Sequence, residues 1–123
     1  SWLPQDAGAL RGGPRAFAEE NGLDESLFKA ILRKLGFERA QFEKDMEGYS
    51  AGQKKKVLLA RSLCRPAHLY LWDEPLNFVD VYSRMQIESL LLRYAPTMVF
   101  VEHDRAFSDK IATRTVEILP PEA

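Results

Sequence analysis

A short turn built from Tyr49, Ser50, Ala51, Gly52 and Gln53 precedes a run of residues that favours a helix. The Ser50 hydroxyl is a good helix cap, because it accepts a hydrogen bond from a backbone N–H group one turn further on. The small residues after it let another molecule approach the backbone closely. Helix starts of this kind attract anions, since their N–H groups and the helix dipole are positive there. The turn is therefore a candidate phosphate site, and an ordinary capped helix is the alternative.

Two acidic residues and a histidine follow two apolar runs further along the chain. Asp73 and Glu74 come directly after the run at 68–72, and His103 follows the run at 98–101. Asp73 is suited to binding Mg²⁺, directly or through water, because a hard cation prefers oxygen ligands. Glu74 is suited to polarising an attacking water, and His103 to holding a phosphate or a water by hydrogen bonds. Together they suggest a metal-dependent nucleotide hydrolase. The alternative for the acidic pair is helix capping or turn polarity before Pro75, and the alternative for His103 is a hydrogen-bonded histidine in a turn.

A parallel sheet would bring these residues together. The continuous apolar runs at 68–72 and 98–101 predict strands that are buried on both faces, and a last strand is expected at 115–119. Helices are expected over 50–65, from Asp80 to the break at Pro96, and over 106–112. This alternation predicts an α/β fold with right-handed crossovers, whose strands gather ligands at their carboxyl ends.

The first half of the chain predicts a small α-helical subdomain. Helices are expected over 15–21, over 24–35 and over 38–45, the second with apolar residues at helical spacing. We therefore expect a lead-in at 1–14, a helical subdomain at 15–48, and an α/β part at 49–123.

The composition of the chain excludes some classes of protein. It has 123 residues, 46% of them hydrophobic, which is enough for a packed core. A net charge of -1 gives no overall basic field for nucleic acid or membranes. The single cysteine, Cys64, cannot form an intrachain disulfide and fits a buried thiol in a reducing compartment. No apolar run is long enough to cross a bilayer, so a cytoplasmic protein is expected.

The ordered motifs resemble those of ATP-binding cassette (ABC) ATPases over nearly the whole chain. The turn at Ser50 and its helix are similar to the signature motif, with Ala51 where glycine is usual. If that position required a positive φ, alanine would cost about 1 kcal/mol. The other resemblances are a Walker B strand at 68–74, a D-loop at 75–80, a switch-histidine loop at 101–104 and a Q-loop glutamine at Gln5.

The resemblance implies a P-loop NTPase-like fold that hydrolyses ATP with the help of Mg²⁺. In the family each ATP lies between two cassettes, so a second cassette is an expected partner. Glu74 and His103 would be the catalytic residues, and Asp73 and Gln5 would hold the metal. The expected nucleotide-binding residues are Gln5, Ser50, Ala51, Gly52, Gln53 and Asp80. Of these, the signature turn would face the ATP that the partner cassette holds.

Residues 72–80 are most similar to the second cassette of ABC-F ribosome-protection proteins. That group is associated with resistance to lincosamides, streptogramin A and pleuromutilins. The resemblance implies two cassettes in one chain, no membrane domain, and the ribosome with its rRNA as partner. Lys54, Lys55 and Lys56 are expected to form a solvated helix face, with rRNA contact as the alternative.

The phosphate-cradling sequence Gly-x-x-x-x-Gly-Lys-Ser/Thr does not occur in the chain. We therefore expect a part of the second cassette that starts at the Q-loop and is inactive alone. Two alternatives remain open: the nucleotide-binding domain of an ABC transporter, which shares the motifs, and a non-catalytic interaction module with the same fold.

Overall fold

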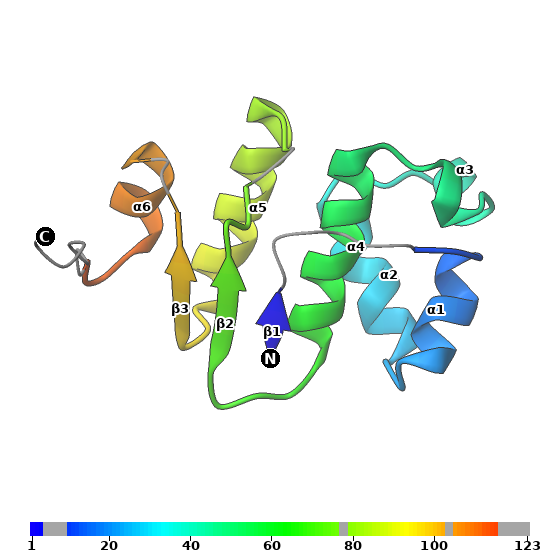
Figure 1. Ribbon diagram of the computed structural model, residues 1–123, viewed down its shortest axis with the longest axis horizontal. Helices are drawn as coiled ribbons and strands as arrows, with labels where there is room; N and C mark the ends of the chain where they lie inside the picture. Colours follow the sequence, from blue (N-terminus) through cyan, green and yellow to red (C-terminus); the bar gives the residue numbers. More distant parts are fainter. Residues whose placement is uncertain (4–9, 77–78, 103–104, 116–123) are drawn as a thin grey trace, which may run out of the picture.

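The computed structural model describes residues 1–3, 10–76, 79–102 and 105–115. Figure 1 shows a small sheet beside a group of helices. The elements in chain order are β1 (Trp2–Leu3), α1 (Pro14–Glu20), α2 (Glu25–Lys34), α3 (Arg39–Phe42), a 3-10 turn (Met46–Gly48), α4 (Ala51–Cys64), β2 (Tyr70–Asp73), α5 (Val81–Tyr94), β3 (Met98–Val101) and α6 (Arg105–Ile111). The strand expected at 115–119 lies almost wholly outside the described residues.

The three described strands form one parallel sheet in the order β1-β2-β3. Leu71 of β2 pairs with Trp2 on one side and with Val99 on the other. Asp73 pairs with Val101 at the carboxyl end of the sheet. Helices α4 and α5 run back against the strand direction, so both begin at that same end (Figure 1). The predicted parallel α/β architecture is confirmed.

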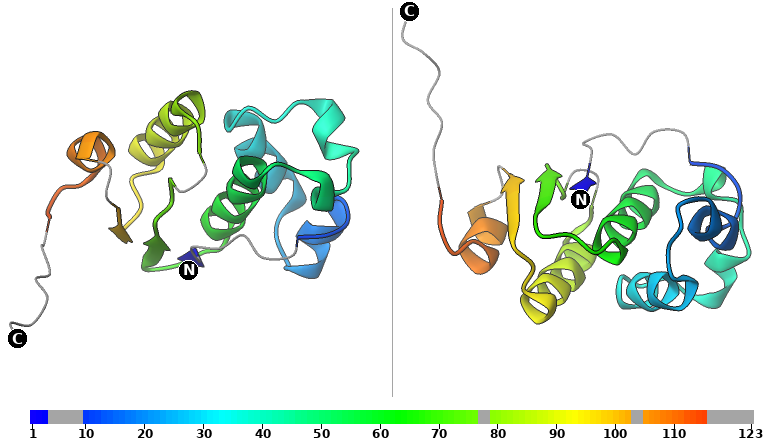
Figure 2. Two further views of the ribbon diagram at one scale, coloured as in Figure 1. Left: turned by 45° about the horizontal axis from the view of Figure 1, so that its top comes forward. Right: turned by 90° about the horizontal axis from the view of Figure 1, so that it is seen from below.

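The prediction that the strands are buried on both faces is wrong for the described part of the chain. The helices lie on one side of the sheet (Figure 2). Trp72 faces them, because its indole N–H group donates to the Ser62 hydroxyl of α4 at 2.9 Å, and it is 2% exposed. Side chains alternate between the two faces of a strand. Leu71, Val99 and Val101 therefore point to the other face, where they are 46%, 56% and 55% exposed. An apolar run thus predicted the strands correctly but could not show how many faces would be covered.

Helices α1 and α2 pack against the sheet through α4. Helix α2 begins where Asp24 accepts a hydrogen bond from the Leu27 N–H group at 3.2 Å. It buries Phe28, whose ring stacks on Phe17 with 5.7 Å between centroids. One cluster of buried apolar side chains continues from these rings through α4 to Trp72. The helix that carries the Ser50 turn is therefore fixed on two sides.

Helix α3 is shorter than the predicted span of 38–45, because Asp45 redirects the chain. Its carboxylate accepts hydrogen bonds from the Glu47 N–H group at 2.8 Å and from the Gly12 N–H group at 3.0 Å. Such side-chain acceptors compete with helix hydrogen bonds and favour turns. The chain consequently leaves α3 at Phe42 and enters the 3-10 turn before Ser50.

Candidate functional site

The turn at Ser50 forms a complete capping box at the start of α4. The Ser50 hydroxyl accepts from the Gln53 N–H group at 3.1 Å, and the Ser50 N–H group donates to Gln53 Oε1 at 2.9 Å. Ser50 is exposed, so another molecule has access to the turn. Ala51 is the first residue of the helix and has no positive φ. Alanine therefore carries no backbone strain at this position.

Tyr49 anchors the turn to helix α3 and to Phe37 just before it, a role that the sequence did not reveal. Its hydroxyl donates a hydrogen bond to the Gln41 carbonyl. Its ring packs edge-on against the ring of Phe37, with 5.7 Å between the ring centroids. Burial, helped by the charge of Asp45, raises the pKa of the Tyr49 phenol. The hydroxyl consequently stays protonated and keeps donating.

The expectation of a solvated face for three consecutive lysines is wrong for Lys55, which is 1% exposed. Lys55 shares a helix face with Leu58, Leu59 and Ser62, since residues three and four apart are neighbours. That face is buried along its length. Lys54 and Lys56 are partly exposed on either side of it, so only these two are accessible to a partner.

Asp73 and Glu74 lie at the carboxyl end of β2, and both are partly exposed. The Glu74 N–H group donates to the Val101 carbonyl at 2.8 Å, which ties it to the end of β3. Glu74 has a φ of 45°, in the left-handed region. A residue other than glycine there costs about 1–3 kcal/mol, and such strain concentrates at functional sites.

Asp80 caps α5 and lies near the first turns of α4. Its Oδ1 accepts from the Ser83 N–H group at 2.7 Å. Hydrogen bonds from Ser83, and then the charge of Lys56, lower the pKa of the Asp80 carboxyl. Burial lowers the pKa of Lys56, and Asp80 opposes that change. The starts of α4 and α5 are therefore close enough to interact electrostatically.

Helices α4 and α5 begin, and strand β2 ends, at one end of the fold (Figure 1). The Ser50 turn, Asp80 and the acidic pair therefore lie at that end. The predicted residues Gln5 and His103 lie outside the described ranges. Within those ranges, no three His, Cys, Asp or Glu side chains group as a ready-made metal cage. Asp73 still fits Mg²⁺, because this ion typically takes one or two carboxylates and completes its shell with water and phosphate oxygens.

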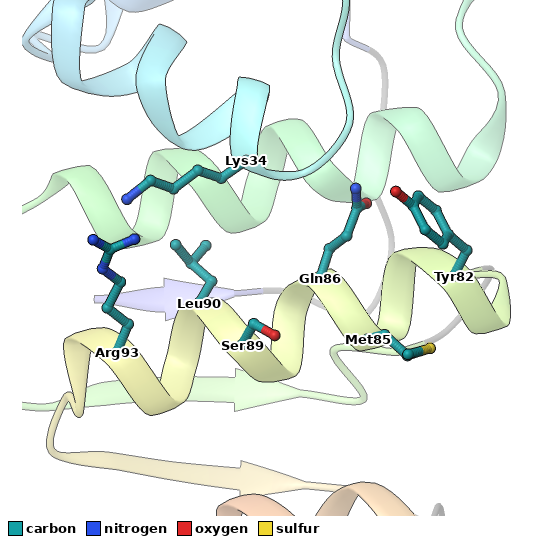
Figure 3. A pocket seen from close by; sticks show the side chains of 7 residues that line it. All are labelled: Lys34, Tyr82, Met85, Gln86, Ser89, Leu90 and Arg93. Carbon is teal, nitrogen blue, oxygen red and sulfur yellow. The ribbon is translucent and has the colours of Figure 1, made fainter.

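A pocket of about 310 Å³ lies along α5, and neither Asp73 nor Glu74 lines it. Figure 3 shows its lining, which comes from α5 and from Lys34 at the end of α2. The lining includes Tyr82, Met85, Gln86, Leu90 and Arg93. It contains none of the predicted site residues.

The thiol of Cys64 is half-buried, and burial followed by the charge of Asp24 raises its pKa from 9.0 to about 11. The folded chain therefore holds this proton more tightly than the unfolded chain. We expect part of the folding stability to be present below pH 9.0 and to be lost as the pH rises toward 11. The unfolding midpoint of the unsubstituted chain should therefore fall relative to that of Cys64→Ala as the pH rises between these values. A constant difference would contradict the raised pKa.

No described helix is both long enough and apolar enough to span a membrane.

A family model described as ABC transporter matches residues 1–77. Probable ATP-binding protein YbiT of Escherichia coli O157:H7 is 32% identical over 102 residues, which is 83% of this chain and 19% of that protein. ATP-binding protein Uup of Caulobacter vibrioides is 35% identical over 82 residues, which is 67% of this chain and 14% of that protein. The chain thus spans less than a fifth of the length of these curated relatives.

Solved structures agree with the fold. A model of ribosome-bound archaeal Pelota and ABCE1 matches with a TM-score of 0.76 and 26% identity, over 89% of this chain and 19% of that chain. The ATP-binding cassette MJ0796 with ADP and Pi matches with a TM-score of 0.70 and 17% identity, over 89% of this chain and 54% of that chain. The second likeness concerns the fold alone, which is the P-loop NTPase-like fold of ABC ATPase domains. With more than half of its residues matched by the family model, the chain belongs to the ABC transporter family of ATP-binding proteins.

Proposed function

We propose that this chain is the part of an ABC-F type cassette that supplies Walker B carboxylates and a signature turn to ATP-hydrolysing sites. The observation that carries the proposal is the placement of two features at one end of the fold. The exposed Ser50 capping box starts α4 at the end where β2 presents Asp73 and Glu74. Both are needed where a metal-bound triphosphate is held between two cassettes.

Each residue has a distinct role in this proposal. Asp73 and Gln5 hold Mg²⁺, which neutralises phosphate charge when bound. Glu74 orients the attacking water and takes its proton, and His103 holds the reacting phosphate by a hydrogen bond. The turn of Ser50, Ala51, Gly52 and Gln53 contacts the partner's ATP through helix N–H groups, and Asp80 borders the same nucleotide.

The proposed partners are ATP, a second cassette in the same longer protein, and the ribosome with its rRNA. Support for the ribosome comes from the likeness to ribosome-bound archaeal ABCE1, and the likeness to the ATP-binding protein Uup supports the ATP-binding part of the proposal. Protection against lincosamides, streptogramin A or pleuromutilins is the finer form of this proposal. A cytoplasmic location without a membrane domain accompanies it. This part alone is proposed to be inactive, since its sequence does not supply the P-loop.

A transport role is the second candidate, because the matching family model is described as ABC transporter. The two functions differ in the partner that activates ATP turnover. Ribosomes should stimulate turnover if the first proposal holds, and a membrane protein should do so if the second holds.

Asp73→Asn in the longer protein tests the metal role. We expect the Mg²⁺ concentration for half-maximal ATP turnover to rise about tenfold, which is ~1.4 kcal/mol of binding free energy. The reason is that a neutral amide is a weaker ligand than a carboxylate for a hard cation. Asp109→Asn removes the same charge from an exposed position on α6 and should change nothing. An unchanged Mg²⁺ requirement in Asp73→Asn would contradict the assignment.

A further inference from the structure

The turn that follows β2 is tied at two points to the end of β3. The Glu74 N–H group donates to the Val101 carbonyl at 2.8 Å. The Leu76 N–H group donates to Glu102 Oε2 at 3.1 Å. Pro75 lies between them and has no N–H group. Both backbone donors of residues 74–76 are therefore directed to two consecutive residues, 101 and 102.

The backbone conformation of this turn is unfavourable unless hydrogen bonds such as these offset its free-energy cost. Glu74 has a φ of 45°, which is unfavourable for any residue with a side chain. A proline at the next position adds to the cost, because it drives the preceding residue toward extended conformations. Only surrounding interactions keep a residue in such a state. Glu74 would move to an extended conformation if these interactions were lost.

The contact of Glu102 is well suited to hold the turn. It is a hydrogen bond from a backbone N–H group to a carboxylate, in a part-buried position. Bonds to an ionised acceptor are roughly twice as strong as neutral ones. It is also a side-chain contact, so a substitution removes it without altering the backbone pairing of β2 with β3.

We propose that Glu102 is a positioning residue. Its carboxylate holds the 74–76 turn and thereby keeps the side chain of Glu74 in the position from which it activates the attacking water. This inference rests on the proposed function of Glu74 in ATP hydrolysis. Glu102 does not touch the reacting groups in this account. It acts through Leu76 and the strained backbone of Glu74.

The tie itself is tested in the longer protein by amide hydrogen exchange. Glu102→Ala should speed exchange at Leu76 by about tenfold, because the N–H group loses its acceptor. Glu102→Gln keeps an acceptor oxygen and should preserve most of the protection. Glu20→Ala changes an exposed glutamate of α1 and serves as the matched control. Unchanged exchange at Leu76 in Glu102→Ala would overturn the inference.

The consequence for Glu74 is tested by ATP turnover of the longer protein. Glu102→Ala should lower kcat by about tenfold to a hundredfold, the effect of a small misplacement, while the KM for ATP stays the same. Glu102→Gln should restore kcat, which separates positioning from a general loss of folding. A normal kcat in Glu102→Ala, with an active unsubstituted protein, would overturn this inference alone. An inactive unsubstituted protein would overturn the proposed function and this inference together.

Discussion

Glu74→Gln in the longer protein should lower the kcat for ATP by about 10²–10⁴-fold, the usual contribution of a general base. Glutamine has the shape of glutamate but cannot take a proton from water. The backbone of residue 74 keeps its hydrogen bond to the Val101 carbonyl, so the turn should hold its form. ATP binding should therefore be unchanged, and phosphate release and nucleotide titration would measure the two effects separately.

The matched control for this substitution is Glu20→Gln, at an exposed glutamate of α1. It should leave kcat unchanged. Equal turnover by Glu74→Gln and the unsubstituted protein would show that another group activates the water.

Glu74→Gln also tests whether the ribosome, rather than a membrane protein, is the partner of the cassette pair. In the proposed pair the triphosphate lies between the two cassettes and holds them together, so a pair that binds ATP without hydrolysing it should stay closed. With Glu74→Gln we then expect ATP-dependent sedimentation with ribosomes. Sedimentation that does not depend on ATP would count against the ribosome as the partner of the closed state.

Phe28→Ala should lower the free energy of unfolding of the chain by about 3–5 kcal/mol, the typical cost of removing a buried ring. Phe28 is 0% exposed and stacks on Phe17 with 5.7 Å between ring centroids. It belongs to the cluster through which α2 packs on α4. Because natural domains are stable by only about 5–15 kcal/mol, the loss should be plain in urea unfolding.

Leu27→Ala is the control, because Leu27 is the neighbouring residue of the same helix and is 38% exposed. Its substitution should have a much smaller effect, since less apolar surface leaves the core. Similar losses for the two variants would mean that α2 does not pack as described.

The local chemistry of the sequence predicted the helix starts and the order of the elements. Asp24, Ser50 and Asp80 each cap the helix that was expected after them. These caps are visible in a sequence because they join residues only three positions apart. The apolar runs likewise placed β2 and β3, and alternation of strand and helix implied a parallel sheet. The motifs themselves indicated the family.

The sequence did not predict which surfaces would be covered or which distant groups would meet. Lys55 is buried and Val101 is exposed, against expectation, because burial depends on the elements that pack nearby. The ring of Tyr49 packs against Phe37, and Glu102 accepts a hydrogen bond from Leu76. Both contacts join residues across turns whose conformation no local sequence pattern predicts.

The strained φ of Glu74 could not be predicted from the sequence either, since the local preference of a residue before a proline opposes it. Short-range capping and periodicity thus determined the elements of this protein. The tertiary structure alone decided the position of Glu74, because hydrogen bonds from a second strand offset the local cost of its conformation.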